Sequence, residues 1–404
     1  MQRPGLERQN TMSKAKGLHP GQSYAEVLAE ARRLGAGQLW EDRVFSHKGD
    51  ACLYDRNKPA SQRQVFNGGN KIKWCRARDV KGAEASRLKL IEGTAEAGEV
   101  EQGELGDCYL LGAMSSVANL KDESGASHIR KLLKSSDADL QLGFATFLLY
   151  KFGSWVEVTV DTWLPCKSDA DRALIFAQNA KEPNELWVSL LEKAYAKLHG
   201  SYESLDGGSV TAALVDLSGG VTESIDLMDD EAMIEVLDGS MFKRLQRYNK
   251  KKNYLLGAAY SRKDVKDQGG MTDTLMQAID GPPCCRAATT TTTTTTATFT
   301  TTTHLRLPPH LQTDMGIMVN HAYTLLDVQK VGEDHTGAVK LLKLRNPWGQ
   351  SEWKGPWSDD AEEWKTGIGR KAKELLNVQF GNDGTFWIAW EDFQAHFNKV
   401  YQLV

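Results

Sequence analysis

Residues 102–118 read QGELGDCYLLGAMSSVA, and this stretch decides how the rest of the chain is interpreted. Cys108 stands where a glycine-containing loop turns into an apolar run typical of a buried helix. The start of a helix stabilises a thiolate, and the two glycines allow a tight bend and a close backbone approach. Gln102 offers an amide donor for a developing oxyanion. The segment predicts a nucleophile, although alone it also fits a buried helix that holds an inert cysteine.

Two later segments supply the partners that a nucleophilic cysteine needs. NHAYTLLDV (320–328) contains His321, whose alternating apolar followers predict a strand that begins there. In LRNPWGQSEWKGPWSD (344–359), Asn346 follows an apolar run and precedes a proline, where a strand would end. Taken singly, His321 also fits a structural histidine and Asn346 a turn residue. Together with the cysteine they are the residue types of a thiol protease, in which a base takes the thiol proton and a third group orients the base.

These segments together resemble the calpain family of cysteine proteases. QGELGDCYLLGA is similar to the nucleophile segment of that family, NHAYTLLDV to its histidine segment and LRNPWGQSEWKGPWSD to its asparagine segment. LWEDRVF (39–45) and LLEKAYAKLHGSYESLDGG (190–208) also look like calpain sequence. The resemblance runs from about Tyr24 to the C-terminus, apart from one insertion.

The resemblance implies an α+β fold of papain-like type, with two subdomains and an active-site cleft between them. It implies Cys108 as nucleophile, His321 as base, Asn346 as the residue that orients the base, and Gln102 as oxyanion donor. Trp348 would shield the His–Asn hydrogen bond, because an apolar ring lowers the local dielectric. Trp348 also fits a core aromatic residue.

The composition fits a globular protein of ordinary kind. Of the 404 residues, 41% are hydrophobic and 25% are charged. The net charge of −4 and the pI of about 6.2 give no sign of the positively charged surface that binds nucleic acid, so no nucleic-acid partner is expected. No stretch approaches the roughly 18 apolar residues of a membrane helix, and the N-terminus lacks the apolar core of a secretory signal.

The cysteines indicate reduced thiols. None of the six has a CxxC spacing, so neither a disulfide framework nor a zinc site is expected: Cys52, Cys75, Cys108, Cys166, Cys284 and Cys285. A nucleophilic thiol needs a reducing compartment, and we expect a cytoplasmic location.

The composition along the chain suggests three parts. Residues 1–23 are expected to be a disordered leader. A change at 201–220 separates a first subdomain, 24–220, which is mainly helical and carries the nucleophile, from a second, 221–404, which is mainly antiparallel β. Residues 281–310 are rich in threonine and bracketed by prolines, which predicts a low-complexity surface insertion.

Periodicity predicts the main elements. Helices are expected at 24–34, at 108–118 and at 185–200, where Glu192 and Lys193 would lie on a solvated face. A hairpin is expected around Gly153–Ser154. Strands are expected at 252–261, 321–331, 338–346 and 385–390.

Calcium is the one cofactor expected, and no organic cofactor is. No EF-hand pattern is present, and on chemistry alone the acidic residues fit a solvated surface. The resemblance implies two calcium sites, one with Glu99 and Glu185 and one with Glu352, Asp359 and Asp383. Glu99 stands where the family usually has aspartate, and Thr385 where it usually has a further carboxylate. Calcium at both sites would favour the arrangement in which the cysteine meets the histidine.

Other departures from the family are small. Asn320 replaces a glycine before the histidine, and asparagine tolerates left-handed backbone angles. Tyr109 replaces a tryptophan. Val404 stands where the protease core ends, so no small regulatory subunit is expected; the expected partners are protein substrates.

The sequence thus predicts a calcium-dependent cytoplasmic cysteine endopeptidase of calpain type. One alternative is an acyl-transfer enzyme on the same residues, whose acceptor is not water. The other is a catalytically inactive calpain-like scaffold that binds partners.

Overall fold

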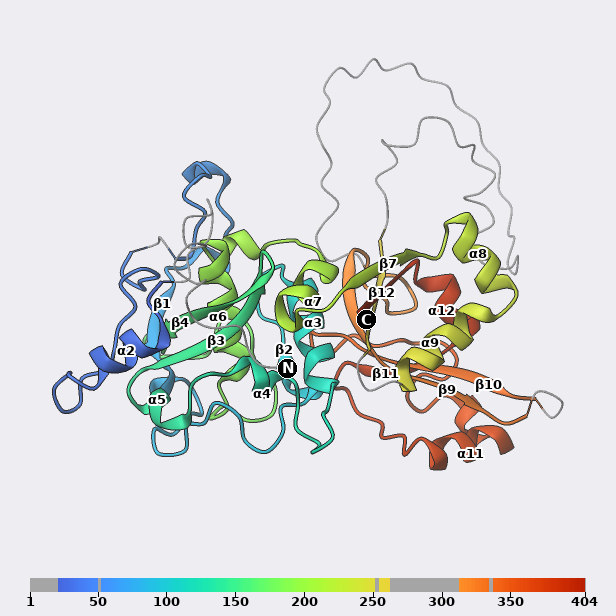
Figure 1. Ribbon diagram of the computed structural model, residues 1–404. Coiled ribbons are helices and arrows are strands. Elements are labelled where there is room, and N and C mark those ends of the chain that lie inside the picture. Colours follow the sequence, from blue (N-terminus) through green and yellow to red (C-terminus); the bar gives the residue numbers. More distant parts are fainter. Residues whose placement is uncertain (1–20, 50–51, 251–253, 262–311, 334–336, 404) are drawn as a thin grey trace, which may run out of the picture.

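The computed structural model describes residues 21–49, 52–250, 254–261, 312–333 and 337–403 (Figure 1). The threonine-rich insertion predicted at 281–310 and most of the leader predicted at 1–23 lie outside the described residues. Both therefore stay predictions.

The first half of the chain combines helices with short strands and one long hairpin. Its α-helices are α2 (Tyr24–Ala31), α3 (Cys108–Asn119), α4 (Ile129–Leu132), α5 (Asp137–Gln141), α6 (Trp187–His199) and α7 (Val210–Ser218). Its strands are β1 (Lys73–Arg76), β2 (Val100–Glu101), β3 (Phe144–Lys151), β4 (Ser154–Asp161), β5 (Trp163–Cys166) and β6 (Gln178–Asn179). Short 3₁₀ turns are η2 (Ala60–Gln62), η3 (Asn67–Gly69), η4 (Ala77–Asp79), η5 (Ala97–Glu99) and η6 (Glu203–Leu205).

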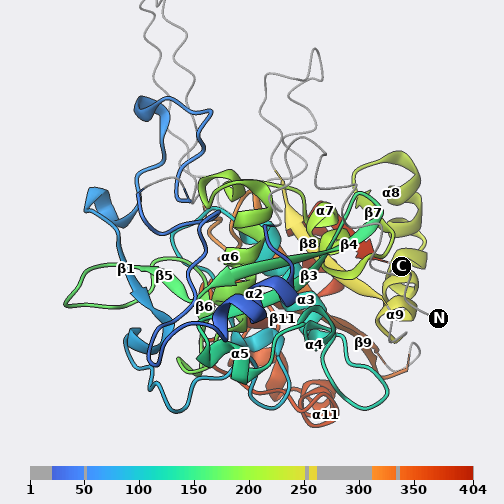
Figure 2. The ribbon, with the colours of Figure 1, turned by 60° about the vertical axis from the view of Figure 1, so that its left-hand side comes forward.

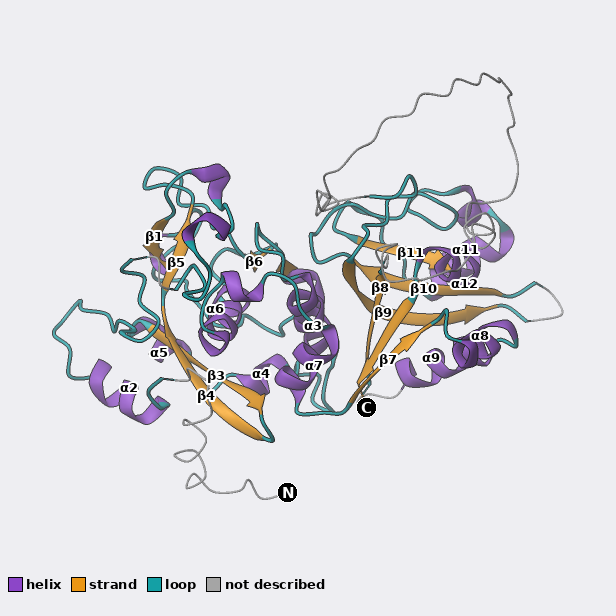
Figure 3. Cartoon of the chain, turned by 90° about the horizontal axis from the view of Figure 1, so that it is seen from above, coloured by secondary structure: helices purple, strands orange, loops and turns teal. Residues whose placement is uncertain are grey.

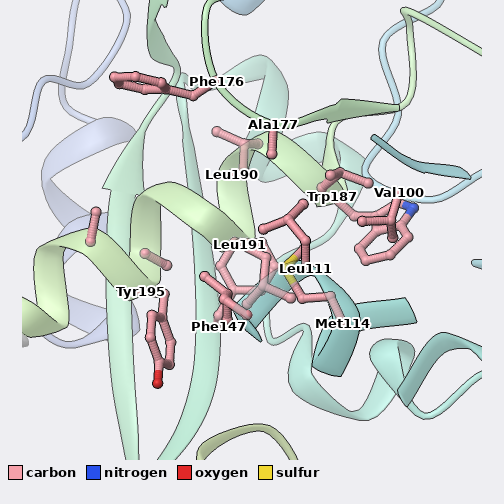
Figure 4. Close-up of a cluster of buried hydrophobic side chains, with 14 of the residues drawn as sticks. Val100, Leu111, Met114, Phe147, Phe176, Ala177, Trp187, Leu190, Leu191 and Tyr195 are labelled. Atoms are coloured by element: carbon pink, nitrogen blue, oxygen red, sulfur yellow. The ribbon is translucent and has the colours of Figure 1, made fainter. Parts of the chain in front are cut away.

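Helices α3 and α6 form the centre of this half. Every residue of α3 from Tyr109 to Ala118 is buried, which explains the unbroken apolar run in the sequence. Figure 4 shows Leu111 of α3 close to Leu191 of α6 and Phe147 of β3. Each such side chain stabilises the fold by about 1.5–3 kcal/mol on burial. The helix that carries Cys108 is thus held rigidly by the core.

Helix α6 differs from the prediction in its charged face. Glu192 and Lys193 are each only 1% exposed, so the expected solvated face is wrong. The Lys193 ammonium donates to the Asp161 carboxylate at 2.6 Å, and the Glu192 carboxyl accepts from the Ala177 N–H. Buried charges persist only when paired in this way. Gly200, with φ of 104°, ends the helix where the sequence predicted.

The predicted hairpin is confirmed, one residue from the expected turn. Strands β3 and β4 pair antiparallel, with Lys151 opposite Ser154. The two-residue turn is therefore Phe152–Gly153, and both residues have positive φ, as a tight hairpin turn of primed type requires. Helix α2 lies across this hairpin in Figure 2 and packs against Phe144.

The second half of the chain is built on one antiparallel sheet. Its six strands follow the order β11-β10-β9-β8-β12-β7 among the described residues. The strands are β7 (Thr222–Asp226), β8 (Leu255–Tyr260), β9 (His321–Val331), β10 (Val339–Arg345), β11 (Thr385–Ala389) and β12 (Lys399–Leu403). The four strands predicted from alternation correspond to β8, β9, β10 and β11, and are confirmed.

Helices in the second half were not predicted. They are α8 (Asp230–Leu237), α9 (Ser240–Lys250), α11 (Gly367–Leu375) and α12 (Trp390–His396), with a 3₁₀ turn η8 (Glu362–Lys365). They are short and bury few residues; α9, for example, buries only Met241, Phe242 and Leu245, although these three stand at helical spacing in the sequence. The description of this half as mainly β is therefore too narrow.

The buried side chains form hydrophobic clusters within both halves of the chain. The largest cluster runs from Phe45 to Leu217, joined by Leu255, Ala322 and Leu403 from later in the chain. A second cluster draws on the chain from Ile225 to Val400. The boundary predicted at 220/221 falls between them and stays a prediction. Together the helices and antiparallel strands confirm the α+β class.

Helix α3 connects the two halves. It packs against β9 and β8, and α7 packs against β12. Figure 3 shows α3 and α7 side by side where the two halves meet. No helix among the described residues is long and apolar enough to cross a bilayer.

Candidate active site

The cysteine lies at the start of α3. Cys108 is the first helical residue, as predicted, and the structure leaves it partly exposed. The loop before it requires both glycines, because its own chain lies close by. A Cβ at Gly103 would lie 2.2 Å from the Ile175 carbonyl oxygen, and one at Gly106 would lie 2.2 Å from the Asp206 carboxylate. The loop therefore delivers the thiol to a defined place.

The surroundings of the thiol oppose its ionisation. Burial, together with the Asp107 carboxylate, raises the pKa of Cys108 to about 11. Hydrogen bonds from the Ala322 and Tyr109 backbone N–H groups act in the opposite direction. The thiolate-stabilising effect expected of the helix start is thus outweighed. A cationic partner is needed for a thiolate at neutral pH.

The histidine and the asparagine meet at one end of the sheet. His321 begins β9, and Asn346 directly follows β10, its antiparallel neighbour. The His321 Nε2 and the Asn346 Oδ1 are 2.8 Å apart. Both side chains are buried, at 5% and 0% exposure. Asn320, just before the histidine, has φ of 54°, the left-handed angle that asparagine tolerates.

Hydrogen bonds determine the tautomer of the histidine. The Asn346 Nδ2 donates to the Gln350 and Ser351 carbonyls, at 2.7 and 3.0 Å. The Asn346 Oδ1 is therefore an acceptor, and the Trp348 N–H also donates to it. His321 must donate from Nε2, so the neutral ring has its lone pair on Nδ1. The base is oriented before any substrate binds.

Trp348 lies beside this hydrogen bond. Its ring centroid is 4.7 Å from that of His321, with the planes tilted by 54°. Tyr323 contacts the same imidazole edge-on at 5.1 Å. The two aromatic rings exclude water and strengthen the bond.

Helix α3, which begins with Cys108, packs against strand β9, which begins with His321. The backbone N–H of Ala322, the residue after His321, is close enough to the Cys108 thiol to lower its pKa. One helical turn on, Gly112 approaches Ala322, and the Thr324 hydroxyl donates to the Gly112 carbonyl at 2.9 Å. Helix and strand therefore run side by side from the thiol onward. The structure thus brings His321, Asn346 and Trp348 into contact and packs α3, which begins with Cys108, against the strand that begins with His321.

Gln102 lies at the same place. Its backbone N–H donates to the Pro347 carbonyl at 2.9 Å, which ties it to the asparagine loop. Its side-chain Nε2 donates to the Leu105 carbonyl at 2.6 Å. This bond uses one of the two amide hydrogens and orients the group.

The first acidic group is buried. Glu99 and Glu185 are 7% and 4% exposed, which excludes the solvated-surface reading for this pair. Burial, followed by the charge of Glu99, raises the pKa of Glu185 to about 7. Burial also raises the pKa of Glu99. Two buried carboxylates, one of which raises the pKa of the other, supply the hard oxygen ligands that calcium prefers, so their chemistry fits calcium.

The second acidic group is looser. Burial and the neighbouring carboxylates raise the pKa values of Glu352 and Asp359. Glu352 accepts hydrogen bonds from the backbone of Asp383 and Gly384. Among the described residues, no three His, Cys, Asp or Glu side chains form a metal-holding group. Each acidic group would need backbone or water oxygens as further ligands.

Two features near the site were missed in the sequence. Asp107 and Glu192 meet in the core directly behind the nucleophile. Arg345, at the end of β10, is 1% exposed and reaches into the first half of the chain. The only signal for either was its position next to a site residue.

Comparison with known proteins points to one family. A family model described as "Calpain family cysteine protease" matches residues 40–403. The chain is 33% identical over 382 residues to the calpain-type cysteine protease DEK1 of Arabidopsis thaliana. It is 30% identical over 383 residues to Calpain-A of Drosophila melanogaster, and 32% identical over 381 residues to the Calpain-1 catalytic subunit of Rattus norvegicus.

These relatives are longer than the matched region. The alignments cover 92%, 94% and 94% of this chain, in the same order. They cover only 15%, 37% and 44% of the relatives. The chain therefore spans less than half the length of each of these three proteins.

Proposed function

Because this chain belongs to the calpain family of cysteine proteases, we propose that it is an endopeptidase that cleaves protein substrates with the Cys108 thiolate. The observation that supports this most directly is the His321–Asn346 hydrogen bond of 2.8 Å beside the start of α3. It orients a base whose lone pair is on Nδ1, next to a thiol that needs a cationic partner.

The reaction would begin with transfer of the thiol proton from Cys108 to His321. The resulting ion pair overcomes the unfavourable effect of burial on the thiolate. The thiolate attacks the peptide carbonyl, and the backbone N–H of Cys108 and the amide of Gln102 donate to the oxyanion. First-turn N–H groups of a helix have no partner within the helix, so the former is available for this.

The second half of the reaction uses the same groups. Protonated His321 donates to the leaving amine, and a thioester remains on Cys108. Water, deprotonated by His321, then hydrolyses the thioester. Asn346 holds the imidazole in place throughout, and Trp348 keeps water from its hydrogen bond.

The arrangement of the substrate site follows from the family. We propose that the cores of the two halves are the two subdomains of a papain-like protease and that the substrate lies in a cleft between them. Backbone hydrogen bonds to an extended peptide would provide most of the recognition. A reactive thiol favours a reducing compartment, so we propose a cytoplasmic location.

Calcium dependence is part of the proposal. Glu99 and Glu185 would hold one ion and Glu352, Asp359 and Asp383 a second. A bound cation supplies positive charge, which compensates the repulsion within each acidic group. Each group includes a residue close to the site along the chain: Glu99 is three residues from Gln102, and Glu352 is six from Asn346.

The experiment that tests the proposal is active-site labelling. A peptide-like epoxide that alkylates thiols is added to the full chain, with and without calcium. We expect labelling of the wild type and of Cys52→Ala, and none of Cys108→Ala. We expect His321→Ala to label at least 10²-fold more slowly. Cys52 is buried away from the site and serves as the matched control.

Two alternatives give other outcomes. An acyl-transfer enzyme would convert a reporter peptide into an amine adduct when an amine acceptor is supplied, whereas a peptidase releases hydrolysis products. A scaffold would show no labelling of the wild type under any condition, and this result would overturn the proposal.

A further inference from the structure

Arg345 is the most deeply buried cation next to the candidate site. It ends β10 and directly precedes Asn346, yet it is only 1% exposed. Burial lowers the pKa of the guanidinium, although arginine still stays charged. A buried charge costs free energy, so its contacts must explain its position.

The guanidinium contacts segments from both halves of the chain. Its Nη2 donates to the carbonyls of Gly98 and Val100, at 3.1 and 3.0 Å. Its Nη1 donates to the Asp383 carbonyl at 2.6 Å and to the Thr385 hydroxyl at 3.4 Å. One planar group therefore joins the strand before Gln102 to the strand after the asparagine loop.

These bonds are to neutral oxygens. Among the described residues, no carboxylate lies within ion-pair distance of Arg345, although Asp383, Glu101 and Glu352 act on it electrostatically. The fork geometry of arginine is what allows donation in two directions at once. Lysine has one ammonium on a flexible stem and lacks this geometry.

The contacts lie close to the reacting groups along the chain. Val100 is two residues from Gln102, and Arg345 is adjacent to Asn346. The Gln102 N–H to Pro347 carbonyl bond provides a second, parallel connection. A shift between the two segments would therefore move the His–Asn pair relative to the cysteine.

We propose that Arg345 is a positioning residue that holds the His321–Asn346 pair in register with the Cys108 thiol. The proposal rests on the peptidase function proposed above. Without the guanidinium, the Gly98, Val100 and Asp383 carbonyls lose this donor. The segment before Gln102 then separates from the segment before β11. A displacement of about 1 Å between reacting groups costs about 10²-fold in rate.

The variants are Arg345→Met, Arg345→Lys and a matched control, Arg76→Met. Arg76 is also buried, at 6% exposure, and its guanidinium donates to the Trp40 carbonyl and the Thr162 hydroxyl. All its contacts lie within the first half of the chain. Loss of either arginine removes a buried cation with its hydrogen bonds, but only Arg345 connects the two halves.

The primary measurement is the pH profile of Cys108 alkylation by iodoacetamide, followed by mass spectrometry of the peptide that carries Cys108. A thiolate–imidazolium pair reacts at neutral pH. We expect Arg345→Met to lose this neutral reactivity and to react only at alkaline pH, with Arg345→Lys in between. We expect Arg76→Met to keep the wild-type profile below its own unfolding temperature. With a fluorogenic peptide, kcat should fall about 10²-fold in Arg345→Met with little change in KM.

The outcomes distinguish a failure of the positioning role of Arg345 from a failure of the proposed peptidase function. If the wild type alkylates at neutral pH but hydrolyses no peptide, the function fails and the profile of Arg345→Met still tests the positioning. If Arg345→Met keeps the wild-type profile, or if Arg76→Met shifts equally, the positioning role is overturned.

Discussion

At the residue scale, Asp107 and Glu192 form a buried carboxyl pair behind the nucleophile. Their exposures are 0% and 1%. Among the described residues, no N–H or hydroxyl of another side chain donates to the Asp107 carboxylate, which contacts the Glu192 carboxyl. Two carboxylates in contact need a proton between them. We infer that Glu192 keeps its proton and donates it to Asp107.

This pair makes stability depend on pH. Burial raises the pKa of Glu192 well above its usual range and that of Asp107 to about 7. A carboxyl group whose pKa is higher in the folded than in the unfolded protein favours folding only while it is protonated. Stability is therefore present at low pH and is lost as the pH rises from about 4 to about 7. Each unit of pKa difference corresponds to about 1.4 kcal/mol.

Glu192→Gln should remove the part of this loss that comes from Glu192, because the amide donates to Asp107 without binding a proton, whereas the part that comes from buried Asp107 should remain. In urea unfolding, we expect the variant to gain about 1–3 kcal/mol over the wild type between pH 5 and pH 8. Glu231→Gln, on the exposed side of α8, is the control and should follow the wild type. An identical pH dependence of Glu192→Gln and wild type would contradict the shared proton.

At the scale of elements, the loop before α3 is held between two other segments. Gly103 lies against the backbone of Ile175 and Phe176, and Glu104 donates its N–H to the Ile175 carbonyl at 2.9 Å. A Cβ there would meet backbone atoms, which move only with the whole segment. The loop that leads to Cys108 can thus adopt this path only because residue 103 has no Cβ atom.

Gly103→Ala should destabilise the fold by about 1–3 kcal/mol, the usual cost of overpacking. Gly367→Ala is the matched control. It begins α11 and has open space around its Cα, so alanine should be neutral or slightly stabilising there. Thermal unfolding of both variants measures the difference. Equal unfolding temperatures for the two would show that the loop adapts.

At the scale of the whole molecule, the first acidic group links the proposed ligand to stability. The pKa of Glu185 is raised to about 7, so its ionisation at higher pH weakens the fold in the absence of a cation. A calcium ion bound to the ionised pair would restore that stability. Protons would then compete with calcium below about pH 7.

Calcium should raise the unfolding temperature more at pH 8 than at pH 5.5. At a calcium concentration of about 100 times Kd the stabilisation would be about 2.7 kcal/mol. Glu185→Gln should lose most of the increase at pH 8 and be more stable than wild type without calcium. Calorimetry with calcium, with magnesium and with neither measures this. An increase that is equal at both pH values, or that survives in Glu185→Gln, would remove this pair from the calcium proposal.

Much of the candidate site was readable from local signals. The boundary between polar loop and apolar run placed the start of α3 at Cys108, and strand alternation placed the start of β9 at His321. The proline after Asn346 marked the end of β10. These signals are local because helix and strand periodicity depend on neighbouring residues alone. The helices α8, α9, α11 and α12 were not predicted, although α9 and α11 place their buried residues at helical spacing.

Residue order alone thus determined the helix that begins at Cys108, the strands that adjoin His321 and Asn346, and the family to which the chain belongs. Only the tertiary structure showed that Glu192 and Lys193 are buried. It also showed that Arg345 donates to the Gly98 carbonyl in the first half of the chain, and that Ala322 lies close to the Cys108 thiol. The reason is physical: periodicity reports which side of an element faces a core. Which charged groups then meet inside depends on the packing of segments that are far apart along the chain.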